Sequence, residues 1–408
     1  MQSSRRIRIC HLQVLPLMSG SQRAMLAIFD QLDQDRFEPH VVCREAGPLT
    51  DELDRRQIQW HALAELDRPI RPVNDFRAYR ALGQLFRKHQ FQIVHTHSSK
   101  PGLLGRLAAR KVGVPITVHH VHAFAFHEFS PASHSLLYSA VERFAARFCD
   151  HMLFVNHEER KFVIERGWLP DARCTTVYNG VDLDRPEIGR QQGERYRFRA
   201  RHDIGEHETV ILFNGRLAYP KQPLLLADIA VELVRLRPSV AWRLVVVGSG
   251  DGENALRRRV LQLGVADRVS MLGWHEDQWP ALCAADIALQ TSLAEGGPIA
   301  LNEAHAAYLP SVASNAKGNR EVVTPQTGFL CDPKNPVAYA SQLVRLVDDP
   351  LLRARMGKAA RRRAELTFDT IANNQRIVQV YEELLAEKGI HRGVADKTHS
   401  TIPQRRAA

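Results

Sequence analysis

The chain has 408 residues, of which 44% are apolar and 25% are charged, and it carries a formal net charge of +10. These proportions are ordinary for a folded protein of two or more domains, and they exclude a low-complexity or fibrous chain. The six cysteines form no Cys-x-x-Cys pair and no run of about 18 apolar residues occurs, which argues against a zinc knuckle, a disulfide framework and a membrane span.

The first residues lack the apolar core of a signal peptide, so we expect a cytoplasmic chain. Positive charge gathers in residues 77–147, which hold ten Lys or Arg residues and two acids. Such a block attracts anions, whether lipid headgroups, nucleic acid or a diphosphate substrate. Peripheral contact with the inner face of an anionic membrane is therefore one expectation, and a solvated face without a partner is the alternative.

The first half of the sequence alternates short apolar runs with helix-length amphipathic stretches. The runs have the length of strands and are rich in Val, Ile and Phe. They lie at residues 7–14, 39–43, 91–95, 115–119 and 151–155. This alternation predicts the α/β class, with a parallel sheet that carries helices on both faces.

Histidines gather at two of these runs, with His95 and His97 in one and His119, His120 and His122 in another. Such a density can indicate a metal site. Because neither cysteine nor a carboxylate pair lies nearby in the sequence, we expect these histidines to hydrogen-bond within the fold or to line a cleft. His122 is the first functional candidate and His97 the second, and we expect no metal ion and no cofactor.

Residues 130–150 have the pattern of an amphipathic helix. Its apolar side is formed by Leu136, Leu137, Val141, Phe144 and Phe148. This stripe predicts packing in the core. The alternative is a surface helix that, with the basic residues Arg106, Arg110 and Lys111, rests on anionic lipid and reaches a polyprenyl-diphosphate acceptor.

The pattern breaks over residues 186–205, a charged stretch rich in Gln and Arg, and then resumes. The second series of strand-like runs lies at residues 209–214, 242–247, 268–272, 286–290 and 310–314. We therefore predict two doubly wound domains, residues 1–186 and 206–386, joined by a linker at residues 187–205. The last helix could pack back on the first domain, and the polar residues 387–408 predict a disordered tail.

In doubly wound sheets ligands bind beyond the carboxyl ends of the strands, so the loops after the apolar runs are informative. After TVILFN, the loop GRLAYPKQP puts Arg216 and Lys221 just before a helix expected near Pro223. Two cations there could hold an anion, although a surface turn gives the same letters. After WRLVVV, the run GSGDGE begins at Gly248, and its glycines allow either a close backbone approach to a ligand or a simple turn.

The stretch LAEGGPIALNEA follows the run at residues 286–290 and holds two glutamates with seven residues between them. Its Gly-Gly-Pro reads as a loop that closes into a helix, whose free amides and dipole suit a phosphate. Glu295 stays on the loop, while Glu303 lies about 7.5 Å along the helix. Because carboxylates accept hydrogen bonds from vicinal hydroxyls, the arrangement fits a nucleotide sugar with its diphosphate in the middle.

Four sequence motifs now resemble one family. EGGPIALNEA is similar to the Glu-x7-Glu motif of the retaining glycosyltransferases of family 4, GRLAYPKQ to their Gly-Arg-Leu-x3-Lys element, and YNGVD at residues 178–182 to their Asn-Gly-Val-Asp loop. Residues 93–126 resemble bacterial members that build capsular polysaccharide, exopolysaccharide and lipopolysaccharide. The motifs follow the family's order, and the resemblance extends over residues 7–385.

The resemblance implies the GT-B architecture, in which two Rossmann-like domains face each other across a cleft. The N-terminal domain would hold a glycan or polyprenyl-linked acceptor, and the C-terminal domain a nucleotide-sugar donor, by family habit a UDP-sugar. Arg216 and Lys221 would neutralise the departing diphosphate, Glu303 would bind the ribose and Glu295 the transferred sugar. Transfer with retention would follow, without a divalent cation.

Carried over by position, the family pattern gives candidate residues for each role. The catalytic candidates are His122, Glu295, Arg216 and Lys221. The donor-binding candidates are Gly20, Arg216, Lys221, Gly248, Glu295, Gly296, Gly297, Pro298, Ile299, Ala300 and Glu303. The acceptor-binding candidates are His97, Lys100 and Arg106.

Two other functions compete with this interpretation. Epimerases of nucleotide sugars share the two-domain plan, and such an enzyme would change the sugar of its donor without any acceptor. A nucleic-acid-binding protein would explain the net charge, but the basic block shows no interleaved stacking aromatics and no known binding module. We therefore expect no nucleic-acid partner.

Overall fold

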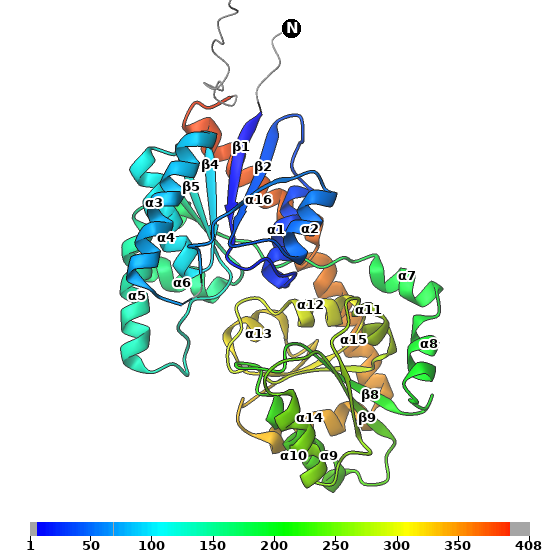
Figure 1. The fold of residues 1–408 in the computed structure, drawn as a ribbon. Helices are drawn as coiled ribbons and strands as arrows, with labels where there is room; N and C mark the ends of the chain where they lie inside the picture. Colours follow the sequence, from blue (N-terminus) through cyan, green and yellow to red (C-terminus); the bar gives the residue numbers. More distant parts are fainter. Residues whose placement is uncertain (1–5, 68, 392–408) are drawn as a thin grey trace, which may run out of the picture.

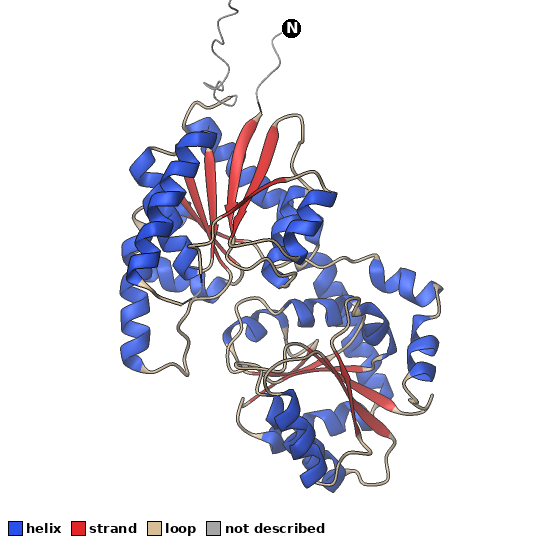
Figure 2. Ribbon diagram, viewed as in Figure 1, coloured by secondary structure: helices blue, strands red, loops and turns tan. Residues whose placement is uncertain are grey.

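A computed structural model describes residues 6–391 apart from residue 68. It forms two lobes, each built on a parallel sheet with helices on both faces (Figures 1 and 2). The α/β class and the two doubly wound sheets predicted from the sequence are confirmed. Of the predicted tail at residues 387–408, the part from residue 392 onward lies outside the described residues.

Within the described residues the first lobe has a seven-stranded sheet. Its strands are β1 (Ile7–Leu12), β2 (Phe37–Cys43), β3 (Gln59–Ala62), β4 (Ile93–His97), β5 (Ile116–Val121), β6 (His151–Phe154) and β7 (Cys174–Thr176). Its helices are α1 (Gly20–Phe29), α2 (Pro48–Arg55), α3 (Pro72–His89), α4 (Ser99–Val112), α5 (Ala132–Ala146) and α6 (His157–Glu165). The strand order is β3-β2-β1-β4-β5-β6-β7, so the winding reverses between β1 and β4.

The second lobe has six parallel strands among the residues that the structure describes. They are β8 (Thr209–Asn214), β9 (Trp242–Val247), β10 (Val269–Gly273), β11 (Ile287–Gln290), β12 (Ser311–Ser314) and β13 (Gly328–Cys331). The helices are α9 (Pro223–Leu236), α10 (Glu253–Gln262), α11 (Trp279–Ala284), α12 (Ile299–Ala306), α13 (Lys317–Val322), α14 (Pro336–Asp348) and α15 (Pro350–Thr367). The order β10-β9-β8-β11-β12-β13 places the reversal between β8 and β11.

Alternation along buried strands explains why each sheet has a core on both faces. In β8 every residue is buried. Ile211 and Phe213 pack into one hydrophobic cluster, whereas Val210 and Leu212 pack into the cluster on the opposite face. Successive side chains of a strand point to opposite faces, so a continuous apolar run is what a sheet covered on both sides requires.

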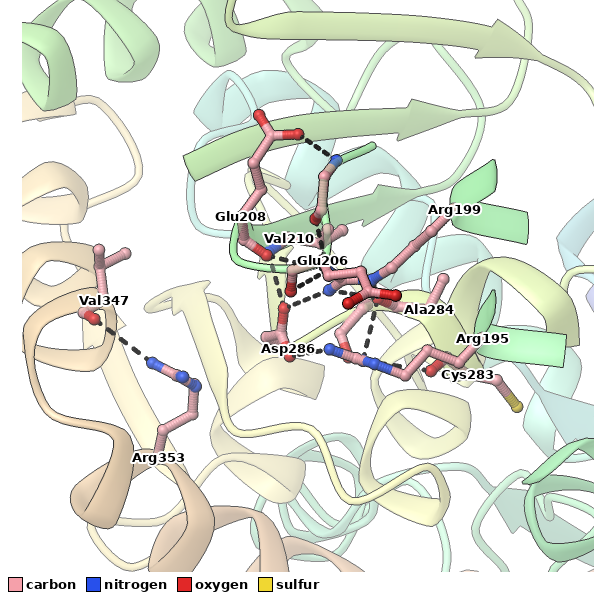
Figure 3. Close-up of polar contacts among 12 residues, drawn as sticks. Arg195, Arg199, Glu206, Glu208, Val210, Cys283, Ala284, Asp286, Val347 and Arg353 are labelled. Carbon is pink, nitrogen blue, oxygen red and sulfur yellow. Dashed lines mark hydrogen bonds and ion pairs between the residues drawn. The ribbon is translucent and has the colours of Figure 1, made fainter. Parts of the chain in front are cut away.

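The segment predicted as a linker is helical and attached to the second lobe. It folds into α7 (Arg185–Gln191) and α8 (Glu194–Arg201). From α8, Arg195 and Arg199 each bond one carboxylate oxygen of Asp286, at 2.8 and 2.7 Å, and both donate to the carbonyl of Ala284 (Figure 3). The same carboxylate accepts the amide of Val210 in β8. Two arginines of the charged stretch that interrupts the strand pattern therefore bind α8 to the second sheet through Asp286.

The last helix, α16 (Thr370–Glu387), leaves the second lobe and packs on the first (Figure 1). Ile377, Val380, Tyr381, Leu384 and Leu385 are buried in the same cluster as Ile7 and Ile9 of β1. The chain returns beside its first crossing, because the amide of Val181 donates to the carbonyl of Phe368 at 2.8 Å. The two connections between the lobes thus run side by side.

The apolar stripe predicted on residues 130–150 does not enter the core. In α5, Leu136, Leu137 and Phe144 are 74%, 62% and 47% exposed. The helix buries its other side instead, through Ala145, Ala146 and the carboxylate of Glu142. The prediction of core packing was therefore wrong, and α5 is a surface helix with an apolar outer side.

Candidate functional site

A cavity of about 1330 Å³ lies between the two lobes. Loops that follow β8, β9 and β11 line it from below in the view of Figure 1, and α1 and the loop after β5 line it from above. These loops flank the winding reversal of each sheet, which is where doubly wound folds bind ligands. The predicted residues that it brings together are Gly20, His122, Arg216, Lys221, Gly248, Glu295, Gly296, Gly297, Pro298, Ile299, Ala300 and Glu303.

Two of the predicted charges pair with each other. Lys221 Nζ lies 2.6 Å from Glu295 Oε1, with the two side chains 18% and 13% exposed. Ser292 also donates its hydroxyl to this carboxylate, and the carbonyl of Lys221 accepts the hydroxyl of Thr291 at 2.7 Å. Arg216 is exposed beside them and donates one bond, to the carbonyl of Tyr219. The loops after β8 and β11 therefore hold an ordered ion pair next to an accessible guanidinium.

The Gly-Gly-Pro loop opens the helix that carries Glu303. Helix α12 starts at Ile299, one position later than the sequence predicts, so that Pro298 is its N-cap residue and not its first helical residue. Burial raises the pKa of Glu303 to about 7, while Arg23 across the cavity works in the opposite direction. The first amides of α12 and a carboxyl group that titrates near neutral pH thus share one wall.

Two asparagines of the first lobe hold this loop in place. Asn156 Nδ2 donates to the carbonyl of Gly296 and Asn179 Nδ2 to that of Gly297, each at 2.9 Å. Asn156 also caps α6, because its side-chain oxygen accepts the amide of Glu159. A Cβ on Gly296 would lie 1.7 Å from the carbonyl oxygen of His122, so only glycine fits there. The Gly-Gly-Pro loop of the second lobe is therefore held in shape by residues of the first lobe.

Glycine is also required at the end of β9. Gly248 has a φ of +133°, and a Cβ there would lie 2.0 Å from the carbonyl oxygen of Gly215. The end of β9 can approach the loop after β8 this closely because position 248 is glycine. On the opposite wall, a Cβ on Gly20 would lie 2.8 Å from the side chain of Ile299, so α1 and α12 nearly touch across the cavity.

The three acceptor-binding candidates, unlike the donor-binding candidates, do not line the cavity. His97 is buried behind His122, at 3.0 Å from its ring. Lys100 binds Asp67 and Asp75 on the side of α3 and does not line the cavity. Arg106 is fully buried.

Arg106 requires a correction, because the sequence analysis treated it as a surface cation. Its guanidinium lies 2.9 Å from the buried carboxylate of Glu142. This pair joins α4 to α5, and the side chain also donates to the carbonyl of Gly102 within its own helix. A buried, paired guanidinium can contact neither an acceptor nor a lipid headgroup.

Three residues were not predicted from the sequence: Arg23 and Lys317, which line the cavity, and Asn156, which holds the Gly-Gly-Pro loop. Arg23 follows Gly20 on the first turn of α1, and Lys317 begins α13 directly after β12. The rule that ligands bind at strand ends could have indicated both. Asn156 follows β6 in the same way, but its contact with Gly296 joins residues 140 positions apart and leaves no local signal.

Comparison with known proteins extends over both lobes. Residues 18–185 match the family described as Glycosyltransferase Family 4, and residues 194–363 match Glycosyl transferases group 1. An Escherichia coli protein named UDP-Gal:alpha-D-GlcNAc-diphosphoundecaprenol alpha-1,3-galactosyltransferase is 32% identical over 387 residues, which is 94% of this chain and 98% of that protein. This chain is a family 4 glycosyltransferase.

Solved structures of low sequence identity share the fold of this glycosyltransferase. The Anabaena protein Alr3699/HepE in complex with UDP superposes with a TM-score of 0.74 at 21% identity, over 92% of this chain and 100% of that one. A glycosyltransferase from Rickettsia africae gives 0.77 at 18% identity, over 93% and 99%. The GT-B fold and a retaining hexosyltransferase activity follow, and the epimerase and nucleic-acid alternatives are set aside.

Proposed function

We propose that this glycosyltransferase moves a hexose from a UDP-sugar to a sugar carried on a polyprenyl diphosphate, in the synthesis of a bacterial cell-surface polysaccharide. The observation that carries the proposal is a single cavity that unites the start of α12, two cations and two carboxylates. The name of the Escherichia coli relative, which covers nearly the whole chain, supports both the donor and the acceptor class.

The donor fits the lower wall of the cavity. The diphosphate would lie at the start of α12, where free amides and the helix dipole favour negative charge. Arg216 and Lys221 would bind its oxygens, and Glu303 would accept hydrogen bonds from the ribose. Glu295, held by Lys221 and Ser292, would orient the sugar.

The reaction breaks the bond between the anomeric carbon and the β-phosphate oxygen, and it forms a bond from that carbon to an acceptor hydroxyl. The cations and amides stabilise the charge that develops on the departing diphosphate. For retention, the acceptor attacks from the face that the diphosphate leaves, and its proton passes to a phosphate oxygen. This proton transfer requires no further general base, and the charge on the diphosphate is neutralised without a metal ion.

An apolar and basic surface beside the cavity supports a lipid-linked acceptor. Its apolar members are Leu136, Leu137 and Phe144 of α5 and Val73 and Phe76 of α3, and its exposed cations are Arg77, Arg80, Arg110, Lys111, Arg143 and Arg147. Helices α3, α4 and α5 lie side by side on one flank of the first lobe (Figure 1). The loop that leads into α5 lines the cavity, so lipid bound on this surface would deliver its diphosphate to the site.

Contact with a membrane would be peripheral. Among residues 6–67 and 69–391, no helix combines the length and apolarity needed to cross a bilayer. Apolar side chains flanked by Lys and Arg instead suit an anionic lipid surface, because the cations attract headgroups while the apolar groups enter the interface.

The donor assignment is tested by thermal shift and calorimetry with a panel of nucleoside diphosphates. We expect UDP to protect the protein most strongly, and Lys221→Ala to remove most of that protection. Transfer is then measured from radiolabelled UDP-hexoses to a synthetic GlcNAc-diphosphate lipid. A panel in which no nucleoside diphosphate shifts the melting temperature would refute the proposal.

The membrane contact is tested by sedimentation with vesicles that contain anionic lipid. Leu136→Ser/Phe144→Ser should lose binding, and added salt should weaken the binding of the native protein. The matched control is Leu351→Ser, which replaces a leucine that is 83% exposed on the other lobe. Equal sedimentation of all three proteins would contradict the contact.

A further inference from the structure

Five imidazoles lie together on one face of the first sheet. They belong to His11 of β1, His95 and His97 of β4, and His120 and His122 at the end of β5, with neighbouring ring centroids 4.4–5.9 Å apart. His120 and His122 line the cavity, whereas the other three are buried behind them.

Four of these rings and one tyrosine form a continuous chain of hydrogen bonds. His122 Nε2 lies 3.0 Å from His97 Nδ1, and His97 Nε2 lies 3.0 Å from His11 Nδ1. His11 Nε2 lies 3.4 Å from the hydroxyl of Tyr381, which also bonds His95 Nδ1. This histidine chain (His122, His97, His11, Tyr381, His95) runs from the cavity to α16.

The rings of the chain are neutral at physiological pH. Burial lowers the pKa of His11 to about 3 and that of His122 to about 4. Burial and the neighbouring rings hold the pKa of His95 and of His97 well below the ordinary value. A neutral imidazole has one donor and one acceptor nitrogen, so the proton on one ring determines the tautomer of the next, and the chain as a whole has two possible directions.

His95, at the inner end of the histidine chain, determines in which direction the hydrogen bonds are donated. His95 Nε2 is buried and has no hydrogen-bond partner among the described residues. A buried N–H group without an acceptor is rarer in proteins than a buried acceptor without a donor. The proton of His95 therefore belongs on Nδ1, where it is donated to Tyr381.

The same donor-to-acceptor direction then holds for each hydrogen bond of the histidine chain, from Tyr381 outward to His122. Tyr381 donates to His11 Nε2, His11 Nδ1 donates to His97 Nε2, and His97 Nδ1 donates to His122 Nε2. His122 is left with its proton on Nδ1. Since its Nε2 is occupied on the inner side, Nδ1 is the nitrogen available to the cavity.

We propose that the histidine chain fixes His122 as the Nδ1–H tautomer, so that it presents a hydrogen-bond donor to an oxygen of the substrate in the cavity. His97, His11 and Tyr381 are then positioning residues, which act through His122 and touch no substrate. The identity of that oxygen rests on the proposed function, but the tautomer does not. It is a property of the protein without ligand.

The tautomer can be read directly in the full chain labelled with ¹⁵N-histidine. Long-range ¹H–¹⁵N correlation spectra at pH 7 distinguish a protonated from an unprotonated ring nitrogen, and loss of signals in His122→Gln assigns the ring. We expect Nδ1 of His122 to carry the proton. A proton on Nε2 would overturn the proposal, whether or not the protein transfers a sugar.

Tyr381→Phe removes the single hydroxyl that joins His11 to His95 and keeps the ring. We expect the His122 signals to become those of mixed tautomers and kcat to fall about tenfold, the effect of one hydrogen bond to substrate, with UDP affinity unchanged. The control is His61→Phe, which breaks another imidazole pair of the same lobe, to His40 at 3.1 Å, and should alter neither measurement. Unmixed signals in Tyr381→Phe would contradict the chain.

A metal ion is the competing use of these rings. Nitrogen atoms of His97, His120 and His122 lie within 4.8 Å of one another, and both nitrogens of His120 are buried without a hydrogen-bond partner in the described part of the chain. The two uses exclude each other, because a metal would take the lone pairs that the chain needs. Zinc and cobalt titration should show no stoichiometric binding. Binding that His120→Ala abolishes would overturn the histidine chain.

Discussion

Glu303 is a carboxyl group whose ionisation is tuned by burial. Its pKa of about 7 means that the carboxylate form grows as pH rises through neutrality. A carboxylate accepts hydrogen bonds from ribose hydroxyls more strongly than a carboxyl group does. The donor should therefore bind more tightly above pH 7 than below it.

We predict that UDP affinity, measured by calorimetry from pH 5.5 to 8.5, rises about tenfold more in the native protein than in Glu303→Gln, which corresponds to one charge-assisted hydrogen bond. UDP has its own phosphate ionisation, and the variant shares it, so the difference reports Glu303. Because the raised pKa reflects a carboxylate that is destabilised by burial, Glu303→Gln should also raise the melting temperature more at pH 8 than at pH 5. Parallel pH profiles would contradict this role.

The ion pair of Lys221 and Glu295 allows a stabilising role to be separated from the proposed role in donor binding. Lys221→Met should leave Glu295 without its positively charged partner and lower the melting temperature of the second lobe by about 2–4 °C, as expected for about 1 kcal/mol in a domain of that size. UDP affinity should fall as well. The double variant Lys221→Met/Glu295→Gln should recover the melting temperature, since no lone charge remains, but it should not recover UDP affinity. Recovery of both would mean that the lysine serves only its glutamate.

Among the elements, α6 and the Gly-Gly-Pro loop share one residue with two separable tasks. Asn156 caps α6 through its oxygen and holds Gly296 through its nitrogen. Asn156→Ser keeps a capping oxygen, so the melting temperature should change little while kcat/KM for the donor falls about tenfold. Asn156→Ala should lose the cap as well, at about 1 kcal/mol of stability.

The matched control for this pair is Asn335→Ser, at the capping residue of α14, whose side chain accepts the amide of Ala338. It makes the same chemical change away from the cavity and should leave kcat/KM unaltered. If Asn156→Ser and Asn335→Ser behaved alike, Asn156 would be a helix cap and nothing more.

The central strands and the edge strand β10 were predicted from the sequence, whereas the other three edge strands were not. The missed strands β3, β7 and β13 all lie at sheet edges. They are short and only partly buried, so their letters lack the apolar run that marks a central strand. For α5 the sequence predicted burial where the structure shows exposure. Periodicity shows that a helix has an apolar side, but it does not show what covers that side.

The residues of the candidate site were predicted from the sequence more accurately than the residues around it. Motif spacing places Arg216, Lys221, Glu295 and Glu303 on loops and a helix at strand ends, and strand order brings these together. Arg106 is buried because it pairs with Glu142 of a different helix. The contact of Asn156 with Gly296 depends on the position of the opposite lobe. Such pairings follow from packing in three dimensions, which no local pattern contains.

At the scale of the molecule, α16 makes the first lobe dependent on the end of the chain. Five of its apolar side chains complete the core below β1, and Arg36 binds Glu382 on its surface at 2.5 Å through two hydrogen bonds. At about 1.5–3 kcal/mol for each buried side chain, their removal would cancel a stability of about 5–15 kcal/mol.

We therefore predict that a chain ending at residue 369 fails to form a stable first lobe, although every strand of both sheets is still present. Circular dichroism and calorimetry should show the melting transition of the second lobe alone, and UDP should bind weakly because Asn156 and Asn179 no longer hold the Gly-Gly-Pro loop. A chain ending at residue 391 keeps α16 and should melt like the full protein. Addition of residues 370–391 as a separate peptide should restore the first transition if packing, and not the covalent link, supplies the stability. Two intact transitions in the chain ending at residue 369 would show that the first lobe folds without its last helix.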